Sequence, residues 1–338
     1  MLPPPSMEYK KKPERGLEEV CHFFLSRQSH SGESRSFTGR NVHAGADETT
    51  PLPDVNTRKP ELEVVPTTAV KQNVCLVFFS DSLVTEKCFV ACNLAIELAR
   101  RSLSAALVET TTRLPNIFFL LESLFRESPK GKNALSLLEK LLTVPSTLPP
   151  PEALQLVEIS TGYHQNIKAV FLEKDLDAAN SLTILNTLKR ECDFLIINTP
   201  TDILEFKEMI SLVSPFFVVL TTVHPEALLG SYSLIEKISE KLFCQDVGLL
   251  ILGESHHLKA KAAFNVIAEM AHKFLSCRIR FMGTVPKGPD FTRSILTRTP
   301  LMMESPNSRV SESIKSLANT VTKGYGHPRE FSNVKNNL

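Results

Sequence analysis

The chain has 338 residues, enough for one large domain or two. Its 38 Lys and Arg residues balance 37 Asp and Glu residues, so the net charge of +1 indicates neither a nucleic-acid partner nor an anionic membrane. No run reaches the roughly 20 apolar residues of a membrane span, and the N-terminus lacks the apolar core of a signal peptide. Seven cysteines without C-x-x-C spacing are typical of reduced thiols. We therefore expect a cytoplasmic protein with no transmembrane segment and no direct contact with nucleic acid.

The first 70 residues are rich in Pro, Ser, Thr and charged side chains, which predicts a disordered N-terminal arm. Residues 15–26 differ, because apolar side chains recur there with the i, i+3, i+4, i+7, i+8 spacing of an amphipathic helix. The residues of this stripe are Leu17, Val20, Cys21, Phe24 and Leu25. A helix of about two turns is marginal alone. The segment is therefore expected to dock either on its own domain or on a protein partner.

The stretch 74–101 combines a short apolar run, a polar turn ending in Lys87, and a segment with helical periodicity. Strand, turn, lysine and helix in this order are the layout of a phosphate-binding loop. Such loops use glycine so that backbone N–H groups can converge on the anion, and this turn contains none. The pattern predicts the scaffold of a nucleotide site without its usual loop chemistry.

Strand and helix patterns then alternate, which predicts an α/β fold with a doubly wound, mostly parallel sheet flanked by helices. We expect strands at 105–108, 156–159, 167–172, 194–197, 215–222, 247–252 and 278–283, and helices at 134–142, 176–190, 227–243, 259–275, 290–295 and 311–321. Ligands of such sheets bind at the carboxyl ends of the strands, which places a candidate site around Lys87, Glu109 and Asn198.

Four short motifs occur in this order: Asn-Leu-Ala at 93–95, Ile-Ile-Asn-Thr-Pro at 196–200, Thr-Thr-x-x-Pro-Glu at 221–226, and Gly-Thr-Val-Pro at 283–286. Together they resemble the MinD/ParA family of deviant Walker A P-loop ATPases, which includes FlhG-type regulators. The resemblance implies a P-loop domain over residues 71–322, followed by a polar tail at 323–338. MinD itself ends in a basic amphipathic membrane helix, and no such segment is recognisable in this tail.

The resemblance also aligns the candidate site. Lys87 falls on the Walker lysine, Ser82 on the signature lysine that reaches the partner's nucleotide, and Cys88 on the hydroxyl residue that holds magnesium. Leu83, Val84 and Glu86 replace the three glycines. The sequence leaves two interpretations of Lys87 open: an ordinary lysine at a helix N-terminus, or a retained contact to an anion.

The acidic positions of the family are altered as well. Glu109 aligns with the first aspartate of the D-x-D motif, and Thr111 replaces the second. Asn198 stands where active members carry the Walker B aspartate, and an amide brings no charge to oppose Mg²⁺. We interpret its side chain as a cap that holds the turn at 199–200. The pair His256–His257 lacks a third ligand nearby and predicts a solvated loop rather than a metal site.

Two functional hypotheses follow. In the first, the chain is a non-hydrolysing, FlhG-like pseudo-ATPase that regulates the positioning or assembly of a cell structure through a protein partner. It would have no catalytic residue, would bind ATP or ADP weakly or not at all, and would take Mg²⁺ only with a nucleotide. In the second, it is a divergent ATPase that binds nucleotide through Lys87 and forms a homodimer on it. Phosphoryl transfer depends on positioning and electrostatics, which the combined substitutions remove, so the first hypothesis is favoured.

Overall fold

The computed structural model describes residues 73–110, 117–123, 157–159, 167–172, 178–199 and 215–325. All of them belong to a unit that spans Lys71–Leu338. The predicted N-terminal arm with its amphipathic segment 15–26 lies outside the described residues, as do Thr111 and the predicted helix 134–142. The expectations for these segments therefore remain predictions.

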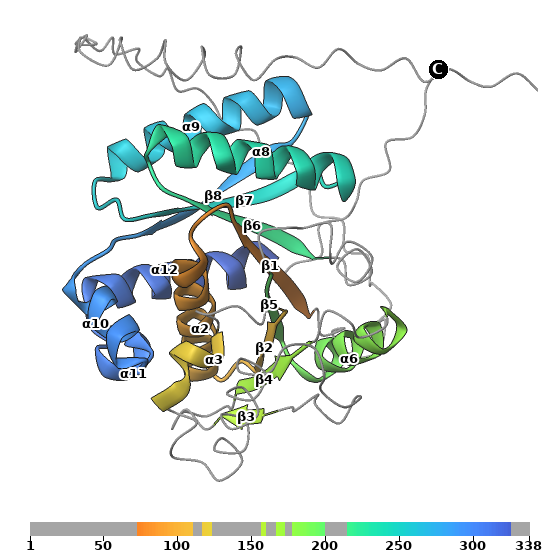
Figure 1. The fold of residues 1–338 in the computed structure, drawn as a ribbon, viewed down its shortest axis with the longest axis vertical. Coiled ribbons are helices and arrows are strands. Elements are labelled where there is room, and N and C mark those ends of the chain that lie inside the picture. Colours follow the sequence, from red (N-terminus) through yellow and green to blue (C-terminus); the bar gives the residue numbers. More distant parts are fainter. Residues whose placement is uncertain are drawn as a thin grey trace, which may run out of the picture. The chain divides into compact units, whose positions relative to one another are not determined.

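The described strands form one eight-stranded sheet in the order β3-β4-β2-β5-β1-β6-β7-β8 (Figure 1). All neighbouring pairs are parallel except the edge pair β3–β4, so the prediction of a mostly parallel sheet is confirmed. The strands are β1 Val74–Ser80, β2 Ala105–Glu109, β3 Val157–Ile159, β4 Ile167–Phe171, β5 Phe194–Asn198, β6 Phe216–Thr221, β7 Asp246–Leu252 and β8 Arg278–Val285.

Helices cover both faces of the sheet. Those of one face are α2 Val84–Arg100, α3 Ile117–Leu120, α10 Pro289–Thr297, α11 Leu301–Glu304 and α12 Arg309–Tyr325, and those of the other are α6 Ala178–Glu191, α8 Pro225–Lys241 and α9 His257–Met270 (Figure 1). Strand β8 is contacted by α12 on one side and by α9 on the other. This arrangement is the doubly wound fold that the sequence pattern predicts. Within the part of the chain that the structure describes, no helix has the length and hydropathy of a membrane span.

Three helices differ from the prediction. The helix expected at 259–275 is split, because α9 ends at Met270 and a π-helical turn, η2 Ala271–Leu275, continues it. The short helix α11 was not predicted, since four residues after a proline carry too little periodicity to be recognised. The last helix extends to Tyr325, three residues into the predicted polar tail.

Helix α2 is the centre of this face, because every residue from Lys87 to Ala99 is buried. A helix that is buried all round needs internal partners for its polar side chains. Asn93 supplies one example: its Nδ2 donates to Phe89 O at 2.8 Å, and its Oδ1 accepts the Met302 N–H at 2.9 Å. The Asn-Leu-Ala motif therefore contains the residue that fastens α11 to α2.

Replacing Asn93 with Leu keeps the number and branching of the side-chain heavy atoms but removes the oxygen that accepts the buried Met302 N–H. We expect the free energy of unfolding to fall by about 1–3 kcal/mol, the cost of such an orphaned donor. The same substitution at exposed Asn265, in the middle of α9, is the control and should change stability by less than about 0.5 kcal/mol. Urea titrations of the two variants measure the difference, and equal stabilities would contradict the role of Asn93.

Candidate functional site

The site is built where the carboxyl ends of β1, β2 and β5 lie side by side. Glu109 is the register partner of Asn198, which is in turn the partner of Phe78. Side chains alternate along a strand, so Glu109 and Asn198 point to the same face as Leu107 and Ile196, two residues earlier on their strands. Leu107 and Ile196 belong to the core shared with α2. Both polar side chains are thus directed toward the face of the sheet that α2 covers.

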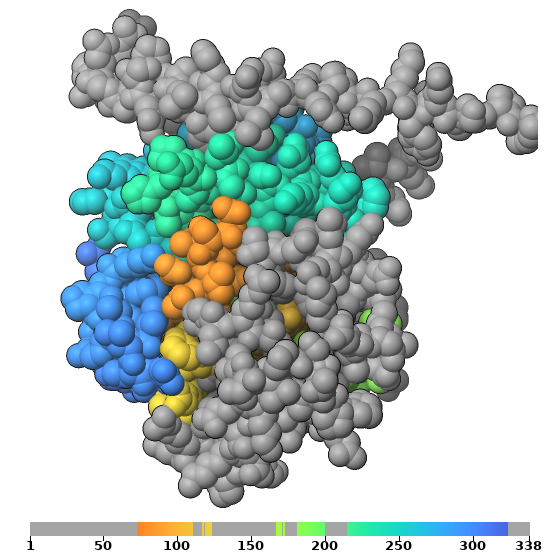
Figure 2. Space-filling view, in the orientation of Figure 1, coloured from red at the N-terminus to blue at the C-terminus, as the bar shows by residue number. Residues whose placement is uncertain are grey.

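The turn before α2 is shorter than the sequence pattern predicts. A polar turn was expected to end at Lys87, but α2 begins at Val84, and only residues 81–83 separate it from β1. The Lys87 N–H donates to Leu83 O at 2.9 Å, an ordinary helical bond. Without glycine, residues 83–86 do not readily adopt the conformations of an open phosphate loop, and helical geometry prevails. Part of the β1–α2 segment reaches the surface between α8 and the α10–α12 group (Figure 2), and Asp81 and Ser82 are exposed.

Lys87 is turned inward. Its side chain is 1% exposed, and Nζ donates to the carbonyl oxygen of Thr199, directly after β5. Burial lowers the pKa of the Lys87 ammonium, and the neighbouring Cys88 and Glu109 act in the opposite direction. Lys87 does lie in the first turn of a helix, but it is neither an ordinary solvated lysine nor free to extend from the turn.

Glu109 and Asn198 are joined directly. Asn198 Nδ2 donates to Glu109 Oε2 at 2.8 Å and lies 3.3 Å from Cys88 Sγ. Glu109 Oε2 also accepts the Ile117 N–H at the start of α3 at 2.9 Å, and Oε1 accepts the Thr110 N–H at 3.0 Å. Both carboxylate oxygens of Glu109 therefore have donors within the protein.

The interpretation of Asn198 as a cap for the following turn is wrong. Thr199 anchors the chain there instead, because its hydroxyl donates to Phe78 O at 3.0 Å. The Asn198 amide bridges Glu109 and Cys88, as an amide can do because it offers two N–H donors. Asn198 Oδ1 and Ser80 Oγ are buried without a hydrogen-bond partner among the described residues.

The six candidate residues divide into two groups. The structure brings together Lys87, Cys88, Glu109 and Asn198, which we call the buried polar cluster, with Thr199 as its backbone acceptor. Burial raises the pKa of the Cys88 thiol, so it remains protonated. Ser82 is exposed on the turn, and Glu86 pairs at 2.5 Å with Lys287 in the connection between β8 and α10. Sequence reasoning missed Thr199, because the group it supplies to Lys87 is a main-chain carbonyl that any residue would offer.

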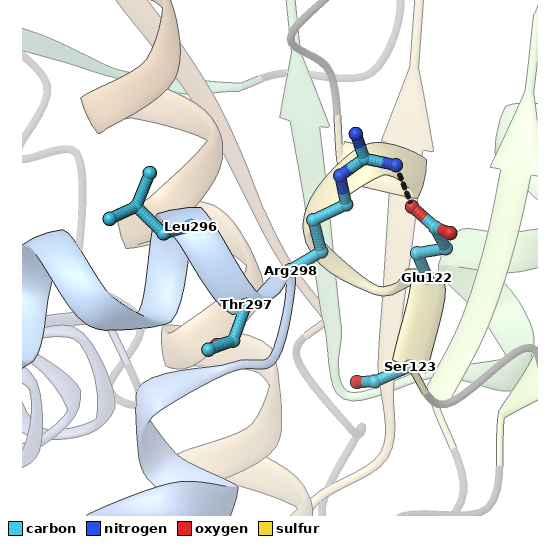
Figure 3. Close-up of a pocket in the computed structure, with 5 residues that line it drawn as sticks. All are labelled: Glu122, Ser123, Leu296, Thr297 and Arg298. Atoms are coloured by element: carbon cyan, nitrogen blue, oxygen red, sulfur yellow. Dashed lines mark hydrogen bonds and ion pairs between the residues drawn. The ribbon is translucent and has the colours of Figure 1, made fainter.

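Two pockets lined by described residues lie elsewhere. One, of about 470 Å³, lies between the end of α3 and the end of α10, where Arg298 pairs with Glu122 (Figure 3) and stacks 4.4 Å from the ring centroid of Phe119. The other, of about 500 Å³, is lined by Asn73 and residues of α6, beside the amino end of β1. Neither is lined by a residue of the buried polar cluster.

The histidine pair is exposed and sits at a helix start. His256 precedes α9 and His257 is its first residue, so the expected loop is one residue shorter than predicted. Among the described residues, no group of three His, Cys, Asp or Glu side chains is placed to hold a metal ion.

Comparison with solved structures identifies the fold. The complex "MinC:MinD cell division protein complex" of Aquifex aeolicus superposes with a TM-score of 0.54 at 16% identity, covering 76% of this chain and 98% of that chain. MinD of Pyrococcus horikoshii OT3 with Mg-ADP gives 0.53 at 15% identity, covering 75% and 98%, and a ParA family ATPase of Chlorobium tepidum TLS gives 0.51 at 12% identity, covering 74% and 99%. The sequence matches no protein-family model and no curated protein sequence. The chain has a MinD/ParA-like P-loop fold, as the sequence resemblance predicts.

The geometry of the buried polar cluster generates a prediction for Asn198→Asp, which introduces the residue that the sequence resemblance implies for active MinD/ParA ATPases at this position. The new carboxylate would lie where the amide now donates to Glu109, 2.8 Å away. Two like charges at this distance do not both ionise readily, so we expect a loss of about 3 kcal/mol in unfolding free energy at pH 8. The folded pair holds a proton more tightly than the unfolded chain does. The loss should therefore shrink as the pH falls toward 5.

Thermal unfolding at pH 8 and pH 5 measures this dependence. Asn198→Leu is the matched control, since it removes the same hydrogen bonds without adding charge and its loss should not vary with pH over this range. If Asn198→Asp is as stable as the wild type at pH 8, the Lys87 ammonium compensates the new charge. This result would contradict the claim that the cluster has no room for a second carboxylate.

Proposed function

We propose that the chain is a pseudo-ATPase: a MinD/ParA-like domain that does not hydrolyse nucleotide and acts through protein interactions. One observation carries the proposal. The two charged groups at the carboxyl edge of the sheet, where ligands of such folds bind, are bonded to neighbouring atoms of the protein. Lys87 is bonded to Thr199 O, and Glu109 is bonded to Asn198, Ile117 and Thr110.

The residues present do not fit a magnesium nucleotide. A phosphate cradle needs converging N–H donors and a free ammonium, and magnesium needs oxygen ligands. Here the Lys87 N–H is used within α2 and its ammonium is buried against a carbonyl. Cys88 presents a protonated thiol where a hydroxyl is needed, and Glu86 brings a negative charge to the first turn of α2. We therefore propose that ATP and ADP bind weakly or not at all.

The proposed role is regulatory and cytoplasmic: a factor, FlhG-like in character, that takes part in positioning or assembling a cell structure. The fold supports this role because the solved structures that share it include a MinC:MinD cell division complex and a ParA family ATPase. The amphipathic stripe of Leu17, Val20, Cys21, Phe24 and Leu25 is the proposed docking element for a protein partner.

A second function retains part of the ancestral chemistry. In this alternative, the chain is a divergent ATPase that binds nucleotide and dimerises on it. The likeness to MinD with bound Mg-ADP and the presence of Lys87 in the first turn of α2 favour it. Binding would require Lys87 to leave Thr199 and its ammonium to turn toward the first turn of α2. It would also bring the phosphates close to Glu86, which now pairs with Lys287.

Calorimetric titration of Mg–ATP into the full chain separates the two functions. We expect no saturable heat up to millimolar nucleotide, and no rise in the melting temperature, because a ligand stabilises only a protein that it binds. A dissociation constant in the low micromolar range would overturn the pseudo-ATPase proposal. The comparator is a repaired chain that carries Ser82→Lys, Leu83→Gly, Val84→Gly, Thr85→Val, Glu86→Gly, Cys88→Thr and Asn198→Asp. The nucleotide affinity of the repaired chain should rise more than its rate of hydrolysis, since Thr111 still replaces the second acidic residue.

The N-terminal stripe is tested separately. Burying one large apolar side chain contributes about 1.5–3 kcal/mol, so Phe24→Ala should weaken docking by roughly tenfold or more. Deleting residues 1–70 then identifies the groove. Loss of partner binding with an unchanged melting temperature indicates a groove on the partner, and a lowered melting temperature indicates one on this domain. If neither property changes, the stripe has no docking role.

A further inference from the structure

The end of α10 is joined to the end of α3 by several contacts of one residue. Arg298 is the last residue of the turn that ends α10, and its guanidinium pairs with the Glu122 carboxylate (Figure 3). The guanidinium also lies 4.4 Å from the centroid of the Phe119 ring in α3. The Arg298 carbonyl oxygen accepts the Ser123 N–H at 3.4 Å. We call these contacts of Arg298 with Phe119, Glu122 and Ser123 the Arg298 clamp.

The backbone of Arg298 adopts a conformation that is costly for arginine. Its φ of 53° lies in the left-handed region, where glycine is the residue that costs least. This conformation ends α10, because the Arg298 N–H donates to Ile295 O at 3.3 Å and the Thr299 N–H donates to Ser294 O at 3.1 Å. The contacts of the Arg298 side chain with α3 and Glu122 offset the conformational cost.

Helix α3 connects the Arg298 clamp to the buried polar cluster. Its first residue, Ile117, donates its N–H to Glu109 Oε2 at 2.9 Å, the same oxygen that accepts from Asn198 Nδ2. The Ile117 carbonyl oxygen accepts the Leu121 N–H at 3.1 Å, directly before Glu122. A helix of four residues is too short to be stable by itself, so its contacts determine its position. One end of α3 therefore holds Glu109, and the clamp holds the other end.

The clamp supplies directional contacts that apolar packing does not. Ile117, Leu120 and Leu121 are buried, and this packing holds α3 against α2 without fixing its exact position, because the hydrophobic effect is non-directional. The bond between Ile117 and Glu109 demands more accuracy. Most N–H···O bonds are shorter than about 3.2 Å, so a displacement of about 0.5 Å along the bond is enough to weaken it. An ion pair and a ring contact at the far end of α3 provide this accuracy.

We propose that Arg298 is a positioning residue for the buried polar cluster and acts through α3. With the clamp closed, the Ile117 N–H is held on Glu109, and α3 covers Cys92 of α2, whose Sγ lies 3.7 Å from Ile117 O. With the clamp broken, α3 moves away from Glu109 and α2 while the sheet stays folded. This role of Arg298 is independent of the pseudo-ATPase proposal, because the contacts exist without a nucleotide.

The clamp lies at the surface and the groups that it positions do not. The Arg298 side chain is 47% exposed and the Glu122 side chain 13% exposed, whereas Glu109 and Asn198 are buried. A partly buried ion pair is screened less by solvent and salt than an exposed one. The clamp thus connects an accessible residue to groups that no partner can touch directly.

Two buried cysteines on opposite faces of the sheet allow a test on the full chain. Cys92 lies against α3, whereas Cys75 precedes Leu76, a residue of the core shared with α2, and so points to the other face. Both thiols react with N-ethylmaleimide only when the structure around them opens. Release of α3 exposes Cys92 alone, and global unfolding exposes both. A short pulse of N-ethylmaleimide, followed by peptide mass spectrometry, measures the two rates in the same sample.

In Arg298→Ala, we expect Cys92 to be labelled roughly tenfold faster than in the wild type, because a partly buried ion pair and an arginine–ring contact together account for a factor of this size. Cys75 should keep its wild-type rate. Hydrogen exchange of the Ile117 N–H should accelerate with Cys92, since the same movement releases Glu109. Glu122→Gln removes the charge from the other side of the pair and should produce a smaller change in the same direction.

Arg293→Ala is the matched control, because Arg293 is an exposed arginine of the same helix that pairs with Asp290 and Glu304. It should leave both labelling rates unchanged, and Arg298→Lys should restore part of the protection of Cys92.

The proposal is overturned if Cys92 and Cys75 accelerate by the same factor, which indicates global destabilisation, or if Cys92 keeps its wild-type rate. It is also overturned if Cys92 accelerates while exchange of the Ile117 N–H does not, because the clamp then fails to reach Glu109. Should Arg298→Ala not fold, the same three comparisons are made on Glu122→Gln.

Discussion

The buried ammonium of Lys87 is the constraint on which the centre of this structure depends. An ammonium removed from water costs several kcal/mol unless it finds partners, and α2 places this one where only 1% of the side chain is exposed. The Thr199 carbonyl accepts its hydrogen bond, and Glu109 contributes the nearby negative charge. Because Thr199 follows β5 and Glu109 ends β2, the first turn of α2 is fixed to two strand ends at once.

This constraint links the fold to the proposed function. In a P-loop ATPase, the lysine, the metal hydroxyl and the acidic residues are arranged around a ligand. In this chain the corresponding positions are connected through Asn198, which bonds Glu109 and contacts Cys88. Asn198 Oδ1 and Ser80 Oγ lack a partner among the described residues, but the charged groups Lys87 and Glu109 are already bonded and have little to gain from a magnesium nucleotide. The domain would then present one constant surface to partners, whereas a nucleotide-dependent relative would alternate between two.

Much of the fold could be predicted from sequence because the central strands are continuous apolar runs and the helices have clear amphipathic periodicity. The seven parallel strands follow from this alternation, and Asn198 and Glu109 could be placed at adjacent strand ends. The local outcome at Lys87 could not be predicted, since pattern and spacing do not show whether a glycine-free turn stays open or continues as helix. The helix begins at Val84, so Lys87 lies within its first turn, and the Lys87 side chain faces inward and bonds to Thr199 O.

Contacts made by main-chain atoms could not be predicted from the sequence either. Nothing in the residue type of Thr199 or Ile117 marks a carbonyl that accepts from lysine or an N–H that donates to glutamate. In the short helix α11, the Met302 N–H donates to Asn93 Oδ1 of α2, a residue 209 positions earlier in the chain.

The most direct measurement is a crystal structure of the full chain grown with excess magnesium and a non-hydrolysable ATP analogue. We predict that Lys87 Nζ remains on Thr199 O, that Asn198 bridges Glu109 and Cys88, and that no nucleotide density lies beside the first turn of α2. A structure in which Lys87 has turned to a bound phosphate, with the turn at 81–86 opened around it, would contradict the claim that the buried polar cluster has replaced the nucleotide.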